Sequence, residues 1–161
     1  MQSRRTFLRL GAGAAAVLAA APLAAAAPQA QFEVTRSEQE WRARLSAAQF
    51  AVLRTGATER PYSSALNDEH HAGLFLCAGC DLALFSSRAK FDSRTGWPSF
   101  WAPLEHAVVT HGDTTLGMRR TEVLCRRCGG HLGHVFDDGP PPTGLRYCMN
   151  GVAMKFTPGA A

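Results

Sequence analysis

The chain has 161 residues, of which 46% are hydrophobic, and a formal net charge of +4. This length suits one domain with a sizeable core and is short for two domains. Without the three arginines of residues 1 to 26 the net charge is +1, and only the pairs Arg119-Arg120 and Arg126-Arg127 remain as basic clusters. No nucleic-acid partner is therefore expected, because such a protein needs a larger basic surface.

Residues 1 to 26 have the composition of an export signal. Arg4 and Arg5 precede Phe7 and Leu8, and a weakly hydrophobic Ala/Gly run then ends in an alanine tract suited to cleavage by a signal peptidase. This head resembles the twin-arginine (Tat) signal of bacteria. The alternative, a single membrane anchor, is disfavoured because the run contains few strongly apolar residues. We expect a periplasmic protein exported by the twin-arginine route, with no stable membrane insertion after signal cleavage.

Two short helices are predicted at the start of the domain. Ser37 followed by Glu40, and Ser46 followed by Gln49, each have the spacing of a capping box. Apolar residues then recur at positions that let each helix lie on a core. These residues are Trp41, Leu45, Phe50 and Leu53.

The rest of the chain has the pattern of β-structure. After the turn-rich stretch 54–68, short runs of apolar and β-branched residues are separated by Gly, Pro and Asp, and no helical period persists. We therefore predict a mainly β fold, an antiparallel β domain preceded by two short helices. The runs are residues 73–80, 82–87, 106–112, 114–125 and 145–156. The predicted organisation is a linker at 27–36, the domain at 37–157 and a C-terminal tail at 158–161.

Four of the five cysteines form two CxxC pairs, separated by 44 residues. Two such turns can aim four thiolates at one point, which is the geometry of a tetrahedral zinc site. Disulfides or redox-active pairs are the alternative, since export permits oxidation, although a CxxC disulfide closes a loop too small to restrain the unfolded chain much. A closed four-thiolate site has no open position for substrate, so one zinc ion here would be structural. The predicted ligands are Cys77, Cys80, Cys125 and Cys128.

Cys148 is the only cysteine outside these pairs. A strand through GLRYCMN would put Arg146, Cys148 and Asn150 on one face, and Tyr147 and Met149 on the other. The arginine would lower the pKa of the thiol, and the amide could orient a substrate or hold the thiolate. A lone cysteine is as often a small buried hydrophobic residue. These residues alone leave both interpretations open.

Two further stretches carry candidate functional groups. His131 and His134, in HLGHVFDD, could protonate a developing oxyanion or order water beside a thiolate. A second metal site and idle surface residues are their alternatives, and no third ligand for such a metal is evident. Trp97, in the Gly- and Pro-rich stretch FDSRTGWPSFWAP, could belong to the core, which these residues alone favour, or to a pocket for a small apolar group. The remaining histidines, His70, His71, His106 and His111, are expected at the surface.

Together these stretches resemble the methionine-R-sulfoxide reductases of the MsrB type. The match runs in order through VLRTGATERPYS, LFLCAGCDLALFSSRAKFDSRTGWPSF, RTEVLCRRCGGHLGHVFDDGPPPTGLRYCMNG and MKF, and covers essentially all of residues 37 to 157. The resemblance implies two antiparallel sheets forming an open barrel with helices at one side, and a structural zinc on the paired cysteines. It implies that Cys148 is the nucleophile and that Trp97 holds the S-methyl group of the substrate. The residues implied to surround the sulfoxide oxygen and the thiolate are His131, His134, Arg146 and Asn150.

The implied reaction is attack of the Cys148 thiolate on the sulfoxide sulfur, with a proton from one histidine, which yields methionine and a cysteine sulfenic acid. Many members of the family carry a resolving cysteine just before GWPSF, where this chain has Thr95. With four cysteines on zinc no spare thiol remains, so a thioredoxin-like or other external thiol is expected to reduce the sulfenic acid. The other expected partners are oxidised proteins or peptides, and the protein is expected to be a monomer.

Two other functions compete with this one. A zinc-knuckle binding module would contact a polyanion through the basic pairs and would not use Cys148. A thiol peroxidase or redox sensor would use Cys148 on peroxide. Neither function explains why HLGHVF, GWPSF and RYCMN occur together in one chain.

Overall fold

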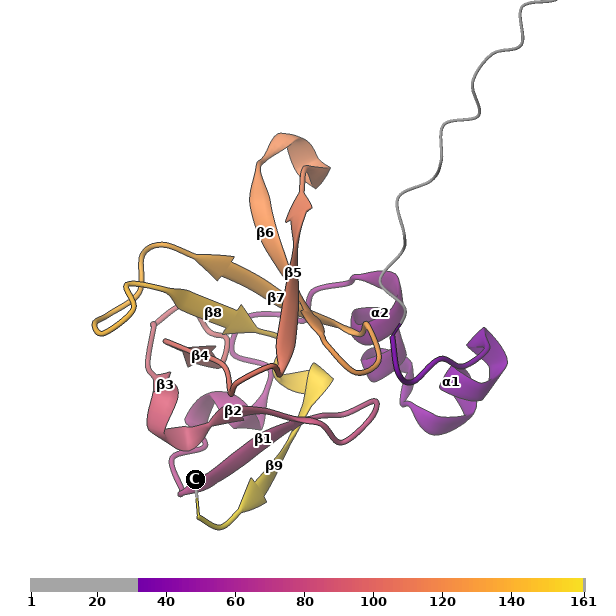
Figure 1. The fold of residues 1–161 in the computed structure, drawn as a ribbon, viewed down its shortest axis with the longest axis horizontal. Coiled ribbons are helices and arrows are strands. Elements are labelled where there is room, and N and C mark those ends of the chain that lie inside the picture. Colours follow the sequence, from indigo (N-terminus) through magenta and orange to yellow (C-terminus); the bar gives the residue numbers. More distant parts are fainter. Residues whose placement is uncertain (1–31, 161) are drawn as a thin grey trace, which may run out of the picture. The chain divides into compact units, whose positions relative to one another are not determined.

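A computed structural model describes residues 32 to 160, which belong to one compact unit (Figure 1). The predicted export signal, residues 1 to 26, lies outside the described residues, as does the first half of the predicted linker, residues 27 to 31. None of the helices in the described range is long and apolar enough to cross a membrane.

Both predicted capping boxes form. Before α1 (Glu38–Arg44), the Ser37 side chain accepts a hydrogen bond from the Glu40 N–H, and the Glu40 carboxylate accepts one from the Ser37 N–H. The same reciprocal arrangement at Ser46 begins α2 (Ala47–Thr55). The apolar positions predicted for these helices are all buried, namely Trp41, Leu45, Phe50 and Leu53. The prediction of two short helices packed on a core is confirmed.

Two antiparallel sheets form the body of the domain, as predicted (Figure 1). The three-stranded sheet has the order β2-β1-β9 and the six-stranded sheet the order β3-β4-β8-β7-β6-β5. The first consists of β1 (Gly73–Cys77), β2 (Ala83–Ser86) and β9 (Met154–Pro158). The second consists of β3 (Lys90–Phe91), β4 (Ser99–Phe100), β5 (Val108–Asp113), β6 (Arg120–Cys125), β7 (His131–Phe136) and β8 (Arg146–Met149). The short 3-10 turns are η1 (Ala65–Asp68), η2 (Ser87–Ala89), η3 (Thr115–Gly117) and η4 (Gly151–Ala153).

Two predicted runs need correction, and three strands, β3, β4 and β7, were not predicted. The run 145–156 contains two strands, β8 and β9, which belong to different sheets because η4 turns the chain between them. The run 114–125 becomes a strand only at Arg120, since η3 occupies its start. The strand β7 was not predicted, because its histidines and glycine interrupt the apolar alternation that marks a strand.

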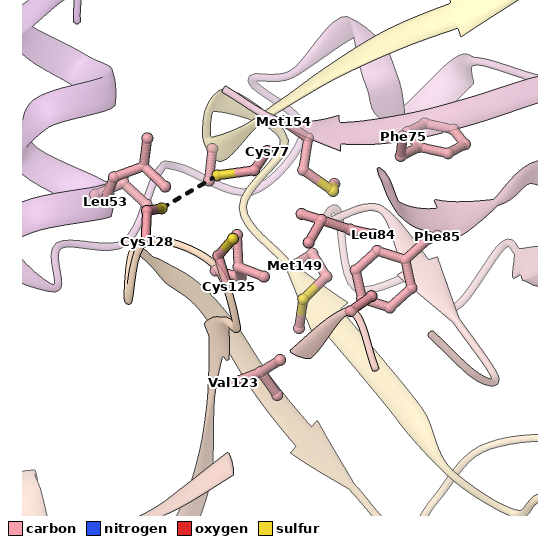
Figure 2. Close-up of a cluster of buried hydrophobic side chains, with 14 of the residues drawn as sticks. Leu53, Phe75, Cys77, Leu84, Phe85, Val123, Cys125, Cys128, Met149 and Met154 are labelled. Carbon is pink, nitrogen blue, oxygen red and sulfur yellow. Dashed lines mark hydrogen bonds between the residues drawn. The ribbon is translucent and has the colours of Figure 1, made fainter. Parts of the chain in front are cut away.

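The core lies where the two sheets face each other. Phe75 of β1 meets Phe100 of β4 edge to face, with 4.9 Å between ring centroids, and Phe85 of β2 stacks on Phe100 at 4.3 Å. All three rings are fully buried. Figure 2 shows Phe75 and Phe85 in this layer together with Met149. Burial of each ring contributes roughly 1.5–3 kcal/mol, so this contact across the sheets fixes their packing.

Candidate active site and metal site

The two cysteine pairs lie at the ends of strands from different sheets. Cys77 is the last residue of β1 and Cys125 the last of β6, and the turns that follow carry Cys80 and Cys128. In each turn the N–H of the residue after the second cysteine donates to the carbonyl of the first, at 2.9 Å and 2.8 Å. The four sulfur atoms lie within 4.8 Å of one another. Figure 2 shows Cys77 and Cys128 facing each other, with Leu53 of α2 beside them.

The spacing of these sulfur atoms fits a tetrahedral metal ion. The Sγ atoms of Cys77 and Cys128 are 3.7 Å apart, and those of Cys80 and Cys125 are 3.5 Å apart. A zinc–sulfur bond of about 2.3 Å places the sulfur atoms of a tetrahedral site about 3.8 Å apart. A disulfide would need about 2.05 Å, and no cysteine is bridged in the described residues. The four cysteines can therefore hold a metal ion, which would fasten the two sheets together because each sheet supplies one cysteine pair.

A separate cavity of about 150 Å³ is lined by four of the six other predicted site residues. Cys148, Trp97, His134 and Asn150 all line it. The other lining residues are Thr58, Arg120, Gly133 and Phe136. His131 and Arg146 do not line the cavity, but each contacts a residue that does. His131 lies beside His134, and Arg146 lies beside Phe136. The structure thus brings into one cavity residues as far apart in the chain as Thr58 and Asn150.

Cys148 lies in the middle of the six-stranded sheet, paired in register with Ser99 of β4 and His134 of β7. Burial raises the pKa of its thiol, while the charge of Arg146 and a contact with Thr95 act in the opposite direction. Arg146 therefore lowers the pKa of the Cys148 thiol, as predicted, but the net shift of this pKa is upward and the expectation of a lowered value is wrong. Burial outweighs the effect of Arg146, because Arg146 shares its charge with a carboxylate.

Asp138 shares the charge of Arg146. The Nε and NH2 groups of Arg146 donate to the two oxygens of Asp138, both at 2.9 Å. The guanidinium also lies over the ring of Phe136, 4.5 Å from its centroid. This ion pair, with the Phe136 ring, holds Arg146 in place beside Cys148 on β8 while reducing the positive charge felt by the thiol.

A β-bulge brings the two histidines together. Residues three apart in a regular strand point to opposite faces. In β7 the register with β6 shifts at Leu132, which has no partner between His131 and Gly133. The extra residue turns His131 toward the side of His134, and their ring centroids are 5.5 Å apart. Sequence spacing alone could not show this, because a bulge depends on pairing with another strand.

No side chain fits at Gly133, because the backbone of β8 lies too close. A Cβ atom at this position would collide with the carbonyl oxygen of Cys148 and lie 3.0 Å from the Cα of Met149. Strands β7 and β8 therefore approach each other at Gly133 closely enough to form one wall of the cavity.

Two carboxylates that sequence reasoning missed bind these histidines. Nδ1 of His131 is 2.6 Å from Oε1 of Glu122, and Nε2 of His134 is 2.8 Å from Oδ2 of Asp113. Asp113 also pairs with Arg120 at 2.7 Å. Burial lowers the pKa of His134, and the hydrogen bond to Asp113 opposes this shift. Nε2 of His131 is buried and has no hydrogen-bond partner within the described residues.

Glu59 is a further residue that the sequence did not single out. Its N–H donates to Oδ1 of Asn150 at 2.9 Å, and its carbonyl accepts from Nε1 of Trp97 at 3.2 Å. Its carboxylate accepts from the N–H groups of Gly151 at 2.6 Å and Val152 at 2.9 Å. Glu59 thus holds two cavity-lining residues and the turn η4 in one arrangement. The only sign of this role in the sequence is that Glu59 lies in the stretch ATERP, which is part of the match to the MsrB family.

Trp97 and Thr95 flank a glycine at the edge of the cavity. Trp97 is only partly buried and lines the cavity, so its interpretation as a core residue is wrong. The Oγ1 atom of Thr95 lies 3.9 Å from Sγ of Cys148. The predicted surface histidines are exposed, as expected, at positions 70, 71, 106 and 111.

Comparison with known proteins places the chain in a family. The family model described as "SelR domain" matches residues 45–158. A protein from Bradyrhizobium diazoefficiens, named peptide methionine sulfoxide reductase MsrB, is 57% identical over 127 residues, which are 78% of this chain and 91% of that protein. This chain belongs to the MsrB family. Proteins of the same name from Thiobacillus denitrificans and Pseudomonas entomophila are 54% and 53% identical, over 76% and 78% of this chain and 94% and 97% of their own lengths.

The MsrB match includes both parts of the site. The matched range, residues 45–158, contains all four paired cysteines and every residue that lines the cavity of Cys148. The resemblance inferred from the motifs of this chain is therefore confirmed at the level of the family.

Proposed function

We propose that this MsrB-family protein reduces methionine-R-sulfoxide in peptides and proteins to methionine, with Cys148 as the nucleophile. The observation that carries the proposal is the single cavity shared by Cys148, Trp97, His134 and Asn150. Membership of the family supports the reaction class, and the name shared by the relatives, peptide methionine sulfoxide reductase, supports a peptide substrate.

The proposed reaction moves one oxygen atom and two electrons. The sulfur of Cys148 attacks the sulfoxide sulfur, and the sulfur–oxygen bond of the substrate breaks as the oxygen accepts a proton. The two electrons pass from the Cys148 sulfur to the substrate sulfur. The sulfur–sulfur bond formed in this attack then breaks and releases methionine, while the oxygen, released as water, bonds to the Cys148 sulfur with loss of one proton and leaves it as a sulfenic acid.

The proposed proton donor is His134, since it lines the cavity beside Cys148. The ion pair with Asp113 stabilises its imidazolium form against the opposing effect of burial. The unpartnered Nε2 of His131 supports a second role. With a proton on each ring nitrogen, Nδ1 would donate to Glu122 and Nε2 would donate a hydrogen bond to the sulfoxide oxygen. Two oriented donors at one oxygen would stabilise the charge that develops there.

Trp97 and Asn150 are proposed to orient the substrate. The indole of Trp97 would contact the S-methyl group, while the oxygen points toward the histidines. With the sulfur facing Cys148, this arrangement admits one configuration at the chiral sulfur. The proposal thereby accounts for selectivity toward the R epimer. Arg146 would stabilise the thiolate as it forms.

We propose a cycle with one redox-active cysteine. The four remaining cysteines form the metal cluster, and the residue in contact with the sulfur of Cys148 is Thr95, which cannot form a disulfide. An external thiol, thioredoxin-like or another reductant, would then reduce the sulfenic acid in two exchange steps. Zinc is the proposed metal because four thiolates at this spacing suit a closed tetrahedral site. Export by the twin-arginine route, a periplasmic location and a monomeric state remain predictions.

The proposal is tested with the separate R and S sulfoxide epimers of one methionine-containing peptide and dithiothreitol as reductant. We expect loss of the R epimer alone, and no loss with Cys148→Ser. The melting temperature and metal content of this variant provide the control, because both should match those of the wild type. Reduction of neither epimer by a folded, metal-loaded protein would contradict the proposal. Consumption of hydrogen peroxide instead would favour the peroxidase alternative.

A further inference from the structure

A second hollow, of about 560 Å³, lies beside the catalytic cavity and has no role in the reaction described above. We call it the α2 groove, because Ala48 and Ala51 of helix α2 form one of its sides. Ala57 and Val152 add to its apolar lining, and Ser63 is among the polar residues at its margin. Small side chains leave this space open next to the site where the substrate is proposed to react.

One residue joins the two hollows. Thr58 is exposed and lines both the α2 groove and the catalytic cavity. The next residue, Glu59, holds Asn150 and Trp97 of the catalytic cavity through its main chain. Its carboxylate binds the N–H of Val152, which lines the α2 groove. The segment around Thr58 is therefore a shared rim between the two hollows.

The main chain of this rim has groups available for binding. Across residues 32 to 160, neither the N–H nor the carbonyl of Thr58 makes a hydrogen bond, whereas both of these groups of Glu59 are engaged. An extended peptide can bind such free main-chain groups and place alternate side chains in pockets of the same surface. Side chains two residues apart point to the same face of an extended peptide and lie about 7 Å apart, close enough to occupy two adjoining hollows.

We propose that the α2 groove binds the polypeptide segment next to the methionine sulfoxide of a peptide substrate. The sulfoxide enters the catalytic cavity, the peptide backbone crosses Thr58, and an apolar side chain two residues away is buried between Ala48, Ala51 and Val152. This inference rests on the proposed function and specifies its substrate class: a polypeptide with an apolar residue two positions from the oxidised methionine.

The test compares three substrates, all as R epimers. They are N-acetylmethionine sulfoxide, a short peptide with leucine two residues before and two residues after the sulfoxide, and the same peptide with glycine in place of leucine. The variant is Ala48→Glu, which places a charge and extra volume in the groove. Glutamate is compatible with the first turn of α2, where it interacts favourably with the helix dipole. The matched control is Ala47→Glu, in the same turn, because Ala47 is exposed and lies outside the groove.

In the wild type we expect kcat/KM for the leucine peptide to exceed that for the glycine peptide about fivefold, because the leucine side chain is buried. Ala48→Glu should remove this advantage and leave N-acetylmethionine sulfoxide within about twofold of the wild type. Ala47→Glu should change none of the three. An equal effect of Ala48→Glu on all three substrates, or no effect on any, would overturn the inference while leaving the reductase proposal intact. If the wild type reduced none of them, the proposed function itself would fail.

Discussion

Removal of the Glu59 carboxylate should loosen the site without touching the nucleophile. In Glu59→Ala, the N–H groups of Gly151 and Val152 lose a charged acceptor at 2.6 Å and 2.9 Å. A hydrogen bond to a charged group contributes about 1.5–3 kcal/mol, and the lower value suits this half-buried carboxylate, so the pair contributes about 3 kcal/mol. For a domain of this size that is a decrease of about 10 °C in the melting temperature.

The same substitution should reduce activity at a temperature where the protein stays folded. The main chain of Glu59 holds Asn150 and Trp97, and a looser segment would misplace both relative to Cys148. We expect kcat/KM at room temperature to fall about tenfold, since small errors in positioning are costly to rate. Glu59→Gln is the matched control, because its amide oxygen can still accept one of the two bonds.

The assay is thermal unfolding followed by circular dichroism, together with steady-state kinetics on the R epimer. The glutamine variant should lie between the wild type and the alanine variant in both measurements. If Glu59→Ala melted within about 2 °C of the wild type, the two hydrogen bonds of the carboxylate would contribute much less than about 3 kcal/mol to the free energy of unfolding. Full activity in a destabilised Glu59→Ala would show that Glu59 supports the fold alone.

Three further predictions concern the thiols and the histidine. Thr95→Cys should form a disulfide with Cys148 after turnover without reductant, because the side chain at position 95 touches the sulfur of Cys148. Mass spectrometry of the non-reduced protein would detect this disulfide. An unbridged product would contradict the contact between positions 95 and 148. Burial lowers the pKa of His134 from 6.5 and raises that of Cys148 from 9.0. The reaction needs one proton shared between His134 and Cys148. We therefore expect kcat/KM to fall in acid once both groups are protonated, to fall in alkali once both have lost their protons, and to stay level between pH 6.5 and 9.0. A fall of kcat/KM within this range would contradict the roles assigned to the two residues. Removal of the metal by a chelator, or Cys128→Ala, should lower the melting temperature sharply, whereas metal analysis showing a metal-free protein with unchanged melting would refute a structural site.

Features set by neighbours in the sequence could be predicted. The capping boxes at Ser37 and Ser46 depend on residues three positions apart, and both form. The CxxC turns at Cys77 and Cys125 are also local. The main alternatives to a metal site for two such turns were disulfides or redox-active pairs, and the four sulfur atoms lie together as a metal site requires. The antiparallel β class followed from short apolar runs and turn residues, which do not depend on which strands pair.

Features set by pairing between distant strands could not be predicted. The bulge at Leu132 exists only in the register of β7 with β6, so the shared face of the two histidines was not visible in HLGHVF. Glu122 binds His131 for the same reason, since β6 and β7 must first lie side by side. The net pKa of Cys148 depended on burial, which the neighbouring Arg146 could not reveal. Charge along one strand was therefore a poor guide to the net pKa of the thiol.

The central claim is that Cys148 takes the oxygen from the substrate. Its most direct test is a single turnover of the metal-loaded protein with excess R-sulfoxide peptide and no reductant. Product and protein are then analysed by mass spectrometry after trapping of sulfenic acid with a selective reagent. We expect one equivalent of methionine peptide per protein, and one molecule of the trapping reagent on Cys148 in place of the sulfenic oxygen, with no disulfide. Formation of methionine with Cys148 unmodified, or with the oxygen on another residue, would contradict the account.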